Sequence, residues 1–383
     1  DLLCYGSRRL CADPRDKVYG LLGIAPPEVA TLINPDYTSP ISEVYQTTFQ
    51  ITVDAVKRLD LLGYCEHSHQ RRLLGLPSWI PNWSVPIGTV PSLSSAFAAG
   101  NSKAAVRFLG RSRSMEVTGV RIGVVREVKT DSAEHLKDPQ RFADRVVAWA
   151  PDSVTLDTEL YPTGESLLDA YTLTLCQNRV QTRPSSGESP RLPMWKMAVW
   201  NLLSDPTNPS YRSEVASSVE VGRGVGLAFV ITEDVHFGLG SPSTKPSDII
   251  CVLLGCKAPI VIRPRTDGGF EVVGACYLHG FSDAESLLGP LPAPWETAFH
   301  NNISGNWVLR FRNNATGEKL LDDPRKGSLP EGWSAVNGVA DLAERQQVPF
   351  QNDLTGEASD CDPRMTVEAL KQCGVNLETF CLF

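Results

Sequence analysis

The sequence contains no long hydrophobic segment and no cluster of basic residues. Its most apolar run, residues 249–256, holds only eight residues, far fewer than the roughly 20 that a membrane-spanning helix needs. No basic cluster is longer than a pair such as Arg71-Arg72, and the formal net charge is -8. Because binding to nucleic acid phosphates requires clustered Lys and Arg, we expect neither a membrane span nor a nucleic-acid partner.

Motifs for disulfides and metals are also missing. The ten cysteines are scattered, with no Cys-x-x-Cys pair and no dense framework, which is typical of reduced thiols in the cytoplasm. Three Asn-x-Ser/Thr triplets point weakly toward secretion. Cys65, His67 and His69 alternate along the chain, but they lack the fourth ligand and the spacing of a structural zinc site. We interpret them as a solvated loop and predict no metal.

Signals for a cofactor or an activated nucleophile are weak. The glycine-rich residues 222–226 (GRGVG) lead into an apolar run and not into a helix N-terminus, whereas phosphate-binding loops present such a terminus. The sequence has no Gly-x-Ser-x-Gly elbow. We therefore predict no cofactor, and the catalytic residues, if any, stay unknown.

The first part of the chain predicts helices. With 383 residues, 42% hydrophobic and 21% charged, the chain has the composition of a globular protein with two or three domains. Residues 13–23 predict a helix with Asp13 as its N-cap, and nothing comparable precedes it. Residues 39–62 predict a long amphipathic helix. In residues 76–83, Trp79 and Trp83 are expected to anchor the chain in a core.

The second part alternates helices and strands. Residues 114–120 and 122–128 predict two strands joined near Gly119. Three helices are expected between residues 138 and 203, the first of them capped by Asp138-Pro139. A candidate mobile loop, residues 181–191, lies between the last two of these helices. Short β-rich runs fill residues 225–278, with a hairpin turn at residues 267–269. Their spacing predicts a small barrel or a curled antiparallel sheet. A short final helix is expected near residues 366–372.

One triplet, Asp-Pro-Arg, occurs three times, at residues 13–15, 323–325 and 362–364. Aspartate favours caps and tight turns, and proline fixes the next backbone angle. We interpret the triplet as a cap or turn signal. We expect no internal repeat larger than this triplet.

Several segments, in order along the chain, resemble a known fungal family. Residues 11–23 (CADPRDKVYGLLG), 35–37 (PDY), 43–45 (EVY) and 76–84 (LPSWIPNWS) resemble the closing part of the heterokaryon incompatibility (HET) domain. Segments after residue 222, including those around Arg223, Asp248 and residues 313–333, resemble the region that follows it. The residues that carry the resemblance, expected to be mostly structural, are Asp13, Arg15, Asp16, Tyr19, Asp36, Tyr37, Pro77, Trp79, Trp83, Arg223 and Asp248.

The resemblance implies a domain organisation and a fold class. Residues 1–84 would be the C-terminal part of a HET domain whose opening aromatic motif is missing. Residues 85–383 would be the associated C-terminal region, helical at about 135–205 and β-rich at about 222–280. The implied fold class is α+β, in which the last helices of a TIR-like α/β domain precede a helical segment and a small antiparallel barrel-like region.

The resemblance also implies a function. Members act in fungal non-self recognition and contribute to regulated cell death when hyphae fuse, and this chain would be non-catalytic by itself. Two alternatives stay open: hydrolysis of NAD or another nucleotide by a TIR-like domain completed by further N-terminal residues, and a non-killing remnant or regulatory binding module. We expect a protein partner and a cytoplasmic location, and homo-oligomerisation is left open.

Arg15 and Asp16 have two interpretations. A structural role would give Arg15 a salt bridge and place Asp16 favourably at a helix N-terminus. A functional role would have Arg15 order a ligand-binding or interface loop, because ligands of such sheets collect near the carboxyl ends of the strands.

Overall fold

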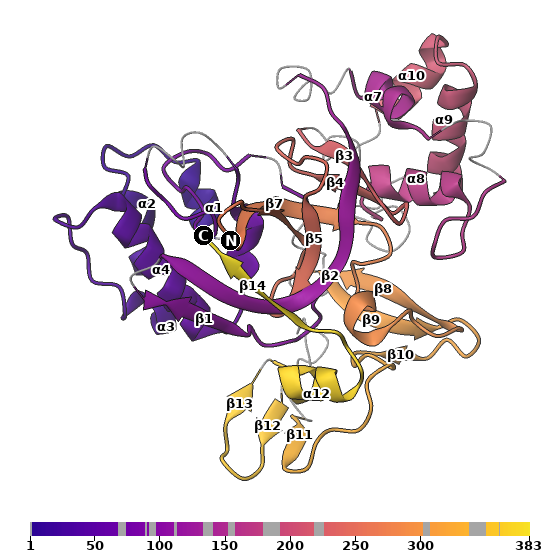
Figure 1. The fold of residues 1–383 in the computed structure, drawn as a ribbon. Helices are drawn as coiled ribbons and strands as arrows, with labels where there is room; N and C mark the ends of the chain where they lie inside the picture. The colour runs from indigo at the N-terminus through magenta and orange to yellow at the C-terminus, as the bar shows by residue number, and fades with distance from the viewer. Residues whose placement is uncertain are drawn as a thin grey trace.

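The fold is mixed α+β, as predicted. The computed structural model describes residues 2–67, 74–88, 90–91, 97–110, 113–132, 141–151, 158–178, 192–217, 226–301, 307–336, 350–359 and 361–383. Figure 1 shows antiparallel strands at the centre, helices around them, and two small hairpin sheets toward the C-terminus.

A closed antiparallel barrel forms the centre of the molecule. Each strand pairs with the next around the ring in the order β2-β3-β4-β7-β6-β5, and β5 pairs again with β2. The predicted turn at residues 267–269 joins β6 to β7, with the Arg265 amide donating to the Gly269 carbonyl oxygen at 3.0 Å. The strands of the ring are β2 (Ser114–Lys129), β3 (Ala228–Thr232), β4 (Phe237–Gly240), β5 (Ile249–Leu253), β6 (Ile260–Pro264) and β7 (Phe270–Leu278).

Strand β2 corrects the prediction of two strands joined near Gly119. It is continuous over 16 residues. Its first part pairs with β1 (Val106–Leu109) and with the last strand, β14 (Glu378–Leu382), and its second part pairs with β5 and β3. A Cβ at Gly119 would lie 2.4 Å from the Val252 carbonyl oxygen. The glycine therefore permits close backbone approach to β5 and does not make a turn.

The N-terminal segment consists of short helices around one longer helix. The predicted helix at residues 13–23 is wrong in extent, because only α2 (Asp16–Tyr19) and the 3-10 turn η1 (Leu22–Ile24) form there, and α1 (Leu2–Ser7) precedes them. The helix predicted at residues 39–62 is α4 (Ile41–Val56). It ends early because Lys57 takes a left-handed conformation (φ 56°), which breaks the helical hydrogen-bond series. The remaining elements are α3 (Pro27–Ala30) and η2 (Asp60–Tyr64).

A second helical group follows β2. The three predicted helices correspond to α7 (Phe142–Trp149), α8 (Leu167–Leu175) and α9 (Leu192–Ser204), while α10 (Pro209–Ala216) was not predicted. The Ser166 hydroxyl caps α8 by accepting from the Asp169 amide at 3.1 Å. The Asp138-Pro139 cap and the loop candidate at 181–191 lie outside the described residues.

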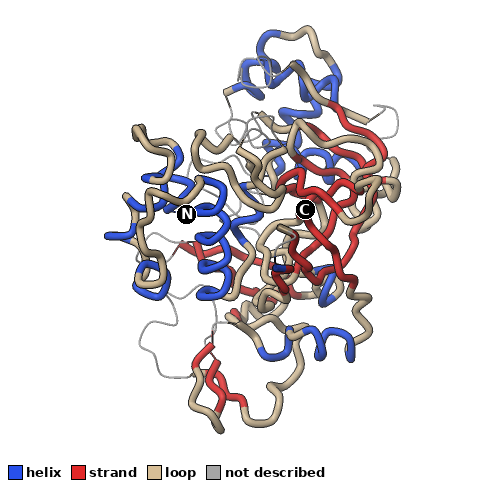
Figure 2. The backbone as a smooth tube through the Cα atoms, turned by 60° about the vertical axis from the view of Figure 1, so that its left-hand side comes forward, coloured by secondary structure: helices blue, strands red, loops and turns tan. Residues whose placement is uncertain are grey.

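Three apolar clusters show how these parts join the barrel. The interior is filled by side chains such as Val230, Val252 and Val273. One part of the outer surface packs on the N-terminal segment, and another packs on α7–α10. Figure 2 shows the two helix groups on different sides of the strands. Since residues on both sides of position 84 share one core, we expect the N-terminal segment and the barrel to unfold together.

The region after the barrel contains a duplication that the sequence analysis missed. Trp295 and Trp333 each pair across a hairpin with an asparagine, Asn313 and Asn352 respectively. We call residues 289–325 the first hairpin module and residues 327–364 the second. Twelve positions are identical between them: Gly289/Gly327, Leu291/Leu329, Pro292/Pro330, Trp295/Trp333, Phe311/Phe350, Asn313/Asn352, Thr316/Thr355, Gly317/Gly356, Glu318/Glu357, Asp323/Asp362, Pro324/Pro363 and Arg325/Arg364.

The hydrogen bonds of the two modules match as well. In the first, the Asn313 side-chain oxygen accepts from the amides of residues 315 and 316 at 2.9 and 3.1 Å; in the second, Asn352 accepts from residues 354 and 355, both at 3.0 Å. The corresponding strands are β8, β9 and β10 (Trp295–Asn301, Trp307–Asn313 and Lys319–Leu320), then β11, β12 and β13 (Trp333–Ala335, Phe350–Asn352 and Ala358–Ser359). Sequence identity and matched bonding together identify one repeated module.

The Asp-Pro-Arg triplets form one local structure at all three sites. In the first, Asp13 Oδ1 accepts from the Arg15 amide at 2.9 Å and from its Nε at 3.0 Å, and Oδ2 accepts from Nη2 at 2.7 Å. Asp323 and Asp362 bind Arg325 and Arg364 through the same atoms. The turn interpretation is confirmed. After the last triplet come η7 (Pro363–Met365), the predicted final helix α12 (Val367–Gln372) and β14.

Candidate functional site

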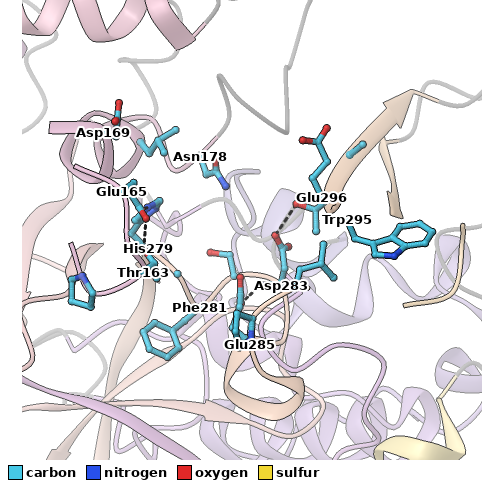
Figure 3. A pocket seen from close by; sticks show the side chains of 18 of the residues that line it. Thr163, Glu165, Asp169, Asn178, His279, Phe281, Asp283, Glu285, Trp295 and Glu296 are labelled. Atoms are coloured by element: carbon cyan, nitrogen blue, oxygen red, sulfur yellow. Dashed lines mark hydrogen bonds and ion pairs between the residues drawn. The ribbon is translucent and has the colours of Figure 1, made fainter. Parts of the chain in front are cut away.

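A large open cavity lies between the end of the barrel, helix α8 and the first hairpin module. Its volume is about 1110 Å³, at the upper end of the range of ligand-binding pockets. The loop that follows β7 forms one wall, and the segment before α8 forms another (Figure 3). Among the lining residues are five carboxylates and two arginines: Glu165, Asp169, Asp283, Glu285, Glu296, Arg312 and Arg325.

A carboxylate–histidine–tyrosine series forms part of this wall. His279 Nε2 lies 2.6 Å from Glu165 Oε1, and His279 Nδ1 lies 2.9 Å from the Tyr277 hydroxyl. Tyr161 donates from its hydroxyl to the His279 carbonyl oxygen at 3.2 Å. The series ties the segment before α8 to the end of β7. Sequence separation explains why sequence analysis missed it, since Glu165 and His279 are 114 positions apart.

The surroundings of Glu165 favour its charged form. Burial acts to raise the pKa of Glu165, but hydrogen bonds from His279 and Thr163 outweigh burial and hold the pKa at about 2. Both ring nitrogens of His279 are engaged, by Glu165 and by Tyr277. A general base needs a ring nitrogen within reach of the substrate proton. The arrangement therefore suits a positioned binding wall better than acid–base catalysis.

A second acidic pair occupies the loop at the start of α11 (Glu285–Leu288). Glu285 Oε2 accepts from the Asp283 amide at 2.7 Å, and Asp283 Oδ2 accepts from the Thr297 hydroxyl at 3.3 Å. Burial, together with the neighbouring Asp283 carboxylate, raises the pKa of Glu285 well above its ordinary range. Glu285 therefore holds its proton more readily than an ordinary glutamate does.

Six of the motif residues are brought together at the N-terminus. Besides its bonds to Asp13, Arg15 donates to the carbonyl oxygens of Tyr37 and Ser39. Asp16 accepts from the Tyr37 hydroxyl at 2.5 Å. Tyr19 packs edge-on against Tyr37, and its hydroxyl lies 3.1 Å from the Asp36 amide nitrogen. Arg15 thus orders the loop at residues 36–39.

The motif residues of segment 76–84 lie in the core that joins the N-terminal segment to the barrel. Trp79 and Trp83 are fully buried, as the sequence predicted, and stack edge-on against Phe49 and Tyr45 of α4. The Trp79 indole nitrogen donates to the Arg113 carbonyl oxygen at 3.1 Å. Pro77 is also buried. The next residue, Ser78, donates its amide to the Phe383 carbonyl oxygen at 2.7 Å.

Asp248 directly precedes strand β5 and forms an ion pair with Arg263. Its two carboxylate oxygens accept from Nε and Nη2 of Arg263, both at 2.8 Å, and Oδ2 also accepts from the Lys245 amide. Asp248 is only 1% exposed. Arg223, with its glycine-rich loop, lies outside the described residues.

Two features are absent from the described ranges. They contain no group of three or more His, Cys, Asp or Glu side chains that could hold a metal ion. Within the same ranges, no helix combines the length and the apolar character of a membrane span. All ten cysteines are free thiols.

Fold and site define an α+β protein that combines a closed antiparallel barrel, two helical groups and a duplicated hairpin module, with an acidic cavity between them. No protein-family model matches the chain. Neither a curated protein nor a solved structure matches it.

Proposed function

We propose that this chain acts in fungal non-self recognition, as the closing part of a HET domain with its C-terminal region, and contributes to regulated cell death on hyphal fusion. The observation that carries the proposal is that the resembling segments are structural partners. Residues from positions 13–19 bind the loop at 36–39. Trp79 and Trp83 pack on Phe49 and Tyr45 of α4. A resemblance spread over distant segments gains weight when those segments contact one another.

We propose a recognition or control role and no catalysis by this chain alone. Within the described residues, the carboxylate–histidine pair of the cavity is occupied by its own partners. The free thiols of all ten cysteines agree with the proposed cytoplasmic location. The proposed partner is a protein.

Expression of the complete gene in a fungal strain that lacks it tests this function. Fusion with an incompatible strain should produce dye uptake and death in the fused cells, while a strain carrying the empty vector should survive. Survival of both strains in every pairing would overturn the proposal. NAD consumption by the complete protein, measured in the same extracts, would favour the hydrolase alternative.

Limited proteolysis tests the remnant alternative. A remnant would yield a stable core that begins after Trp83, with residues 1–84 rapidly digested. We expect the opposite, because the N-terminal segment shares its core with β5, β6 and β7. The first stable fragment should retain α4.

A further inference from the structure

We propose that the acidic wall of the cavity binds the cationic end of a ligand, an alkyl-guanidinium or alkyl-ammonium group. The site consists of Ser282, Asp283 and Glu285 on the loop after β7. Trp295 of the first hairpin module lines another part of the same cavity, and Figure 3 shows its ring directed away from Asp283 and Glu285. The inference does not depend on the proposed function.

The first step is to compare the ion pairs of the carboxylates that line the cavity. Three of its carboxylates have basic partners: Glu165 pairs with His279, Asp169 with Lys196 at 2.8 Å, and Glu296 with Arg312. Glu285, in contrast, forms no ion pair with any residue in the described part of the chain. Arg325 is nearby, but its ion pair is with Asp323.

The second step is an unused hydroxyl. Ser282 lines the cavity and is only 6% exposed. Its hydroxyl makes no hydrogen bond with the residues that the structure describes, although its carbonyl oxygen accepts from the Phe97 amide at 2.8 Å. The hydroxyl oxygen is open to the cavity, where a ligand can reach it. A cation with several N–H donors would supply one to Ser282 and another to Glu285.

The third step is the aromatic side chain at the edge of the site. Trp295 is half-buried and lines the same cavity as Glu285. Its ring packs against the apolar cluster of Phe97 and Phe311, so it supplies apolar surface to the cavity for the alkyl part of the ligand. The raised pKa of Glu285 supports the assignment, since a bound cation would relieve the like-charge interaction with Asp283.

Calorimetric titration of the whole protein tests the site. The probe is acetyl-arginine amide, and acetyl-citrulline amide is the neutral probe of nearly the same shape. We expect heat of binding for the arginine probe and at least tenfold weaker binding for the citrulline probe. Equal binding of the two probes, or no binding of either at millimolar concentration, would overturn the proposal.

Variants locate the binding. Glu285→Gln keeps the shape of the side chain but cannot ionise when a cation binds, so the protein should fold and bind the arginine probe at least tenfold more weakly. Ser282→Ala should weaken binding severalfold. The control Glu318→Gln alters an exposed carboxylate on the turn between β9 and β10 and should bind like the unaltered protein. An unchanged affinity in Glu285→Gln would overturn the assignment of the wall.

Two sources of the cation are distinguished in the same titration. A free metabolite would be matched by agmatine, which carries both an amine and a guanidinium. A protein partner would be matched by an arginine flanked by three residues on each side. Tighter binding of the peptide indicates a protein partner, and tighter binding of agmatine indicates a small molecule; either result supports the site, provided that Glu285→Gln weakens it.

Discussion

The two hairpin modules share their local structure and differ in what their closing arginines hold. In the first module, Arg325 donates to two backbone carbonyl oxygens, of Gly289 at 2.7 Å and of Asp283 at 2.6 Å. In the second, Arg364 donates to the Gly327 carbonyl oxygen at 2.9 Å, which is the equivalent bond, and also to the Asp322 carboxylate. The first arginine therefore fixes the cavity loop, and the second fixes one module to the other.

The difference arises from neighbouring residues and not from the turn itself. Lys326 directly follows the first module, and its ammonium group binds Asp362 of the second at 2.7 Å. The Asp362 side chain is fully buried. It belongs to a network of four charged groups, which are Asp322, Lys326, Asp362 and Arg364. A short motif fixes local geometry, whereas its energetic importance depends on the charges and the burial around it.

The largest effect is expected for Asp362→Ala. The change leaves Lys326 and Arg364 without a common buried carboxylate, and breaking such a network costs about 3–5 kcal/mol of unfolding free energy. Urea denaturation followed by tryptophan fluorescence measures it. The control Glu357→Ala removes an exposed carboxylate from the same module and should cost less than about 0.5 kcal/mol. A loss below about 1 kcal/mol in Asp362→Ala would contradict the network.

A smaller loss, about 2–4 kcal/mol, is expected for Arg325→Met in the first module. Its guanidinium is 5% exposed, and the change leaves the Asp323 carboxylate and two carbonyl oxygens without their donors. Arg325→Lys should recover only part of the loss, because an ammonium group cannot reproduce the planar fork. Full recovery with lysine would show that charge, and not geometry, holds the cavity loop.

Sequence patterns predicted the elements that depend on neighbouring residues. The β-rich runs, the turn at residues 267–269 and the final helix follow from local propensity and turn chemistry. The α+β class is correct for the same reason. The end of α4 was misplaced because a left-handed conformation at Lys57 carries no signal in the sequence.

Features that depend on distant residues were not predictable. The closure of the barrel requires β2 to pair with β5, more than 120 positions away. The cavity joins Glu165 to His279 without any local motif. The duplication was missed because most of the identical positions are turn residues separated by unlike strands. The matched hydrogen bonds show that these scattered identities belong to one repeated module.

The pH dependence of stability tests the charged network of the second module. Burial acts to raise the pKa of Asp362, but Arg364 and Lys326 outweigh it and lower the pKa below that of an unfolded aspartate. The carboxylate therefore stabilises the fold above about pH 4, and this contribution is lost as the pH falls below about 4. In Asp362→Asn, the free energy of unfolding should fall less over this pH range than in the unaltered protein. Parallel pH curves for the variant and the unaltered protein would contradict the assignment.

The smallest effect on stability is expected for the third copy of the turn, at the N-terminus. Asp13 and Arg15 form the same bonds as the other two pairs, but their side chains are 29% and 21% exposed. Because exposed ion pairs contribute little, Arg15→Met should cost at most about 1 kcal/mol by the same denaturation measurement. The variant would still release the loop at residues 36–39, which Arg15 holds through two carbonyl oxygens. Cell death that is lost in Arg15→Met while stability is kept would identify the loop as functional, and normal killing would restrict Arg15 to a structural role.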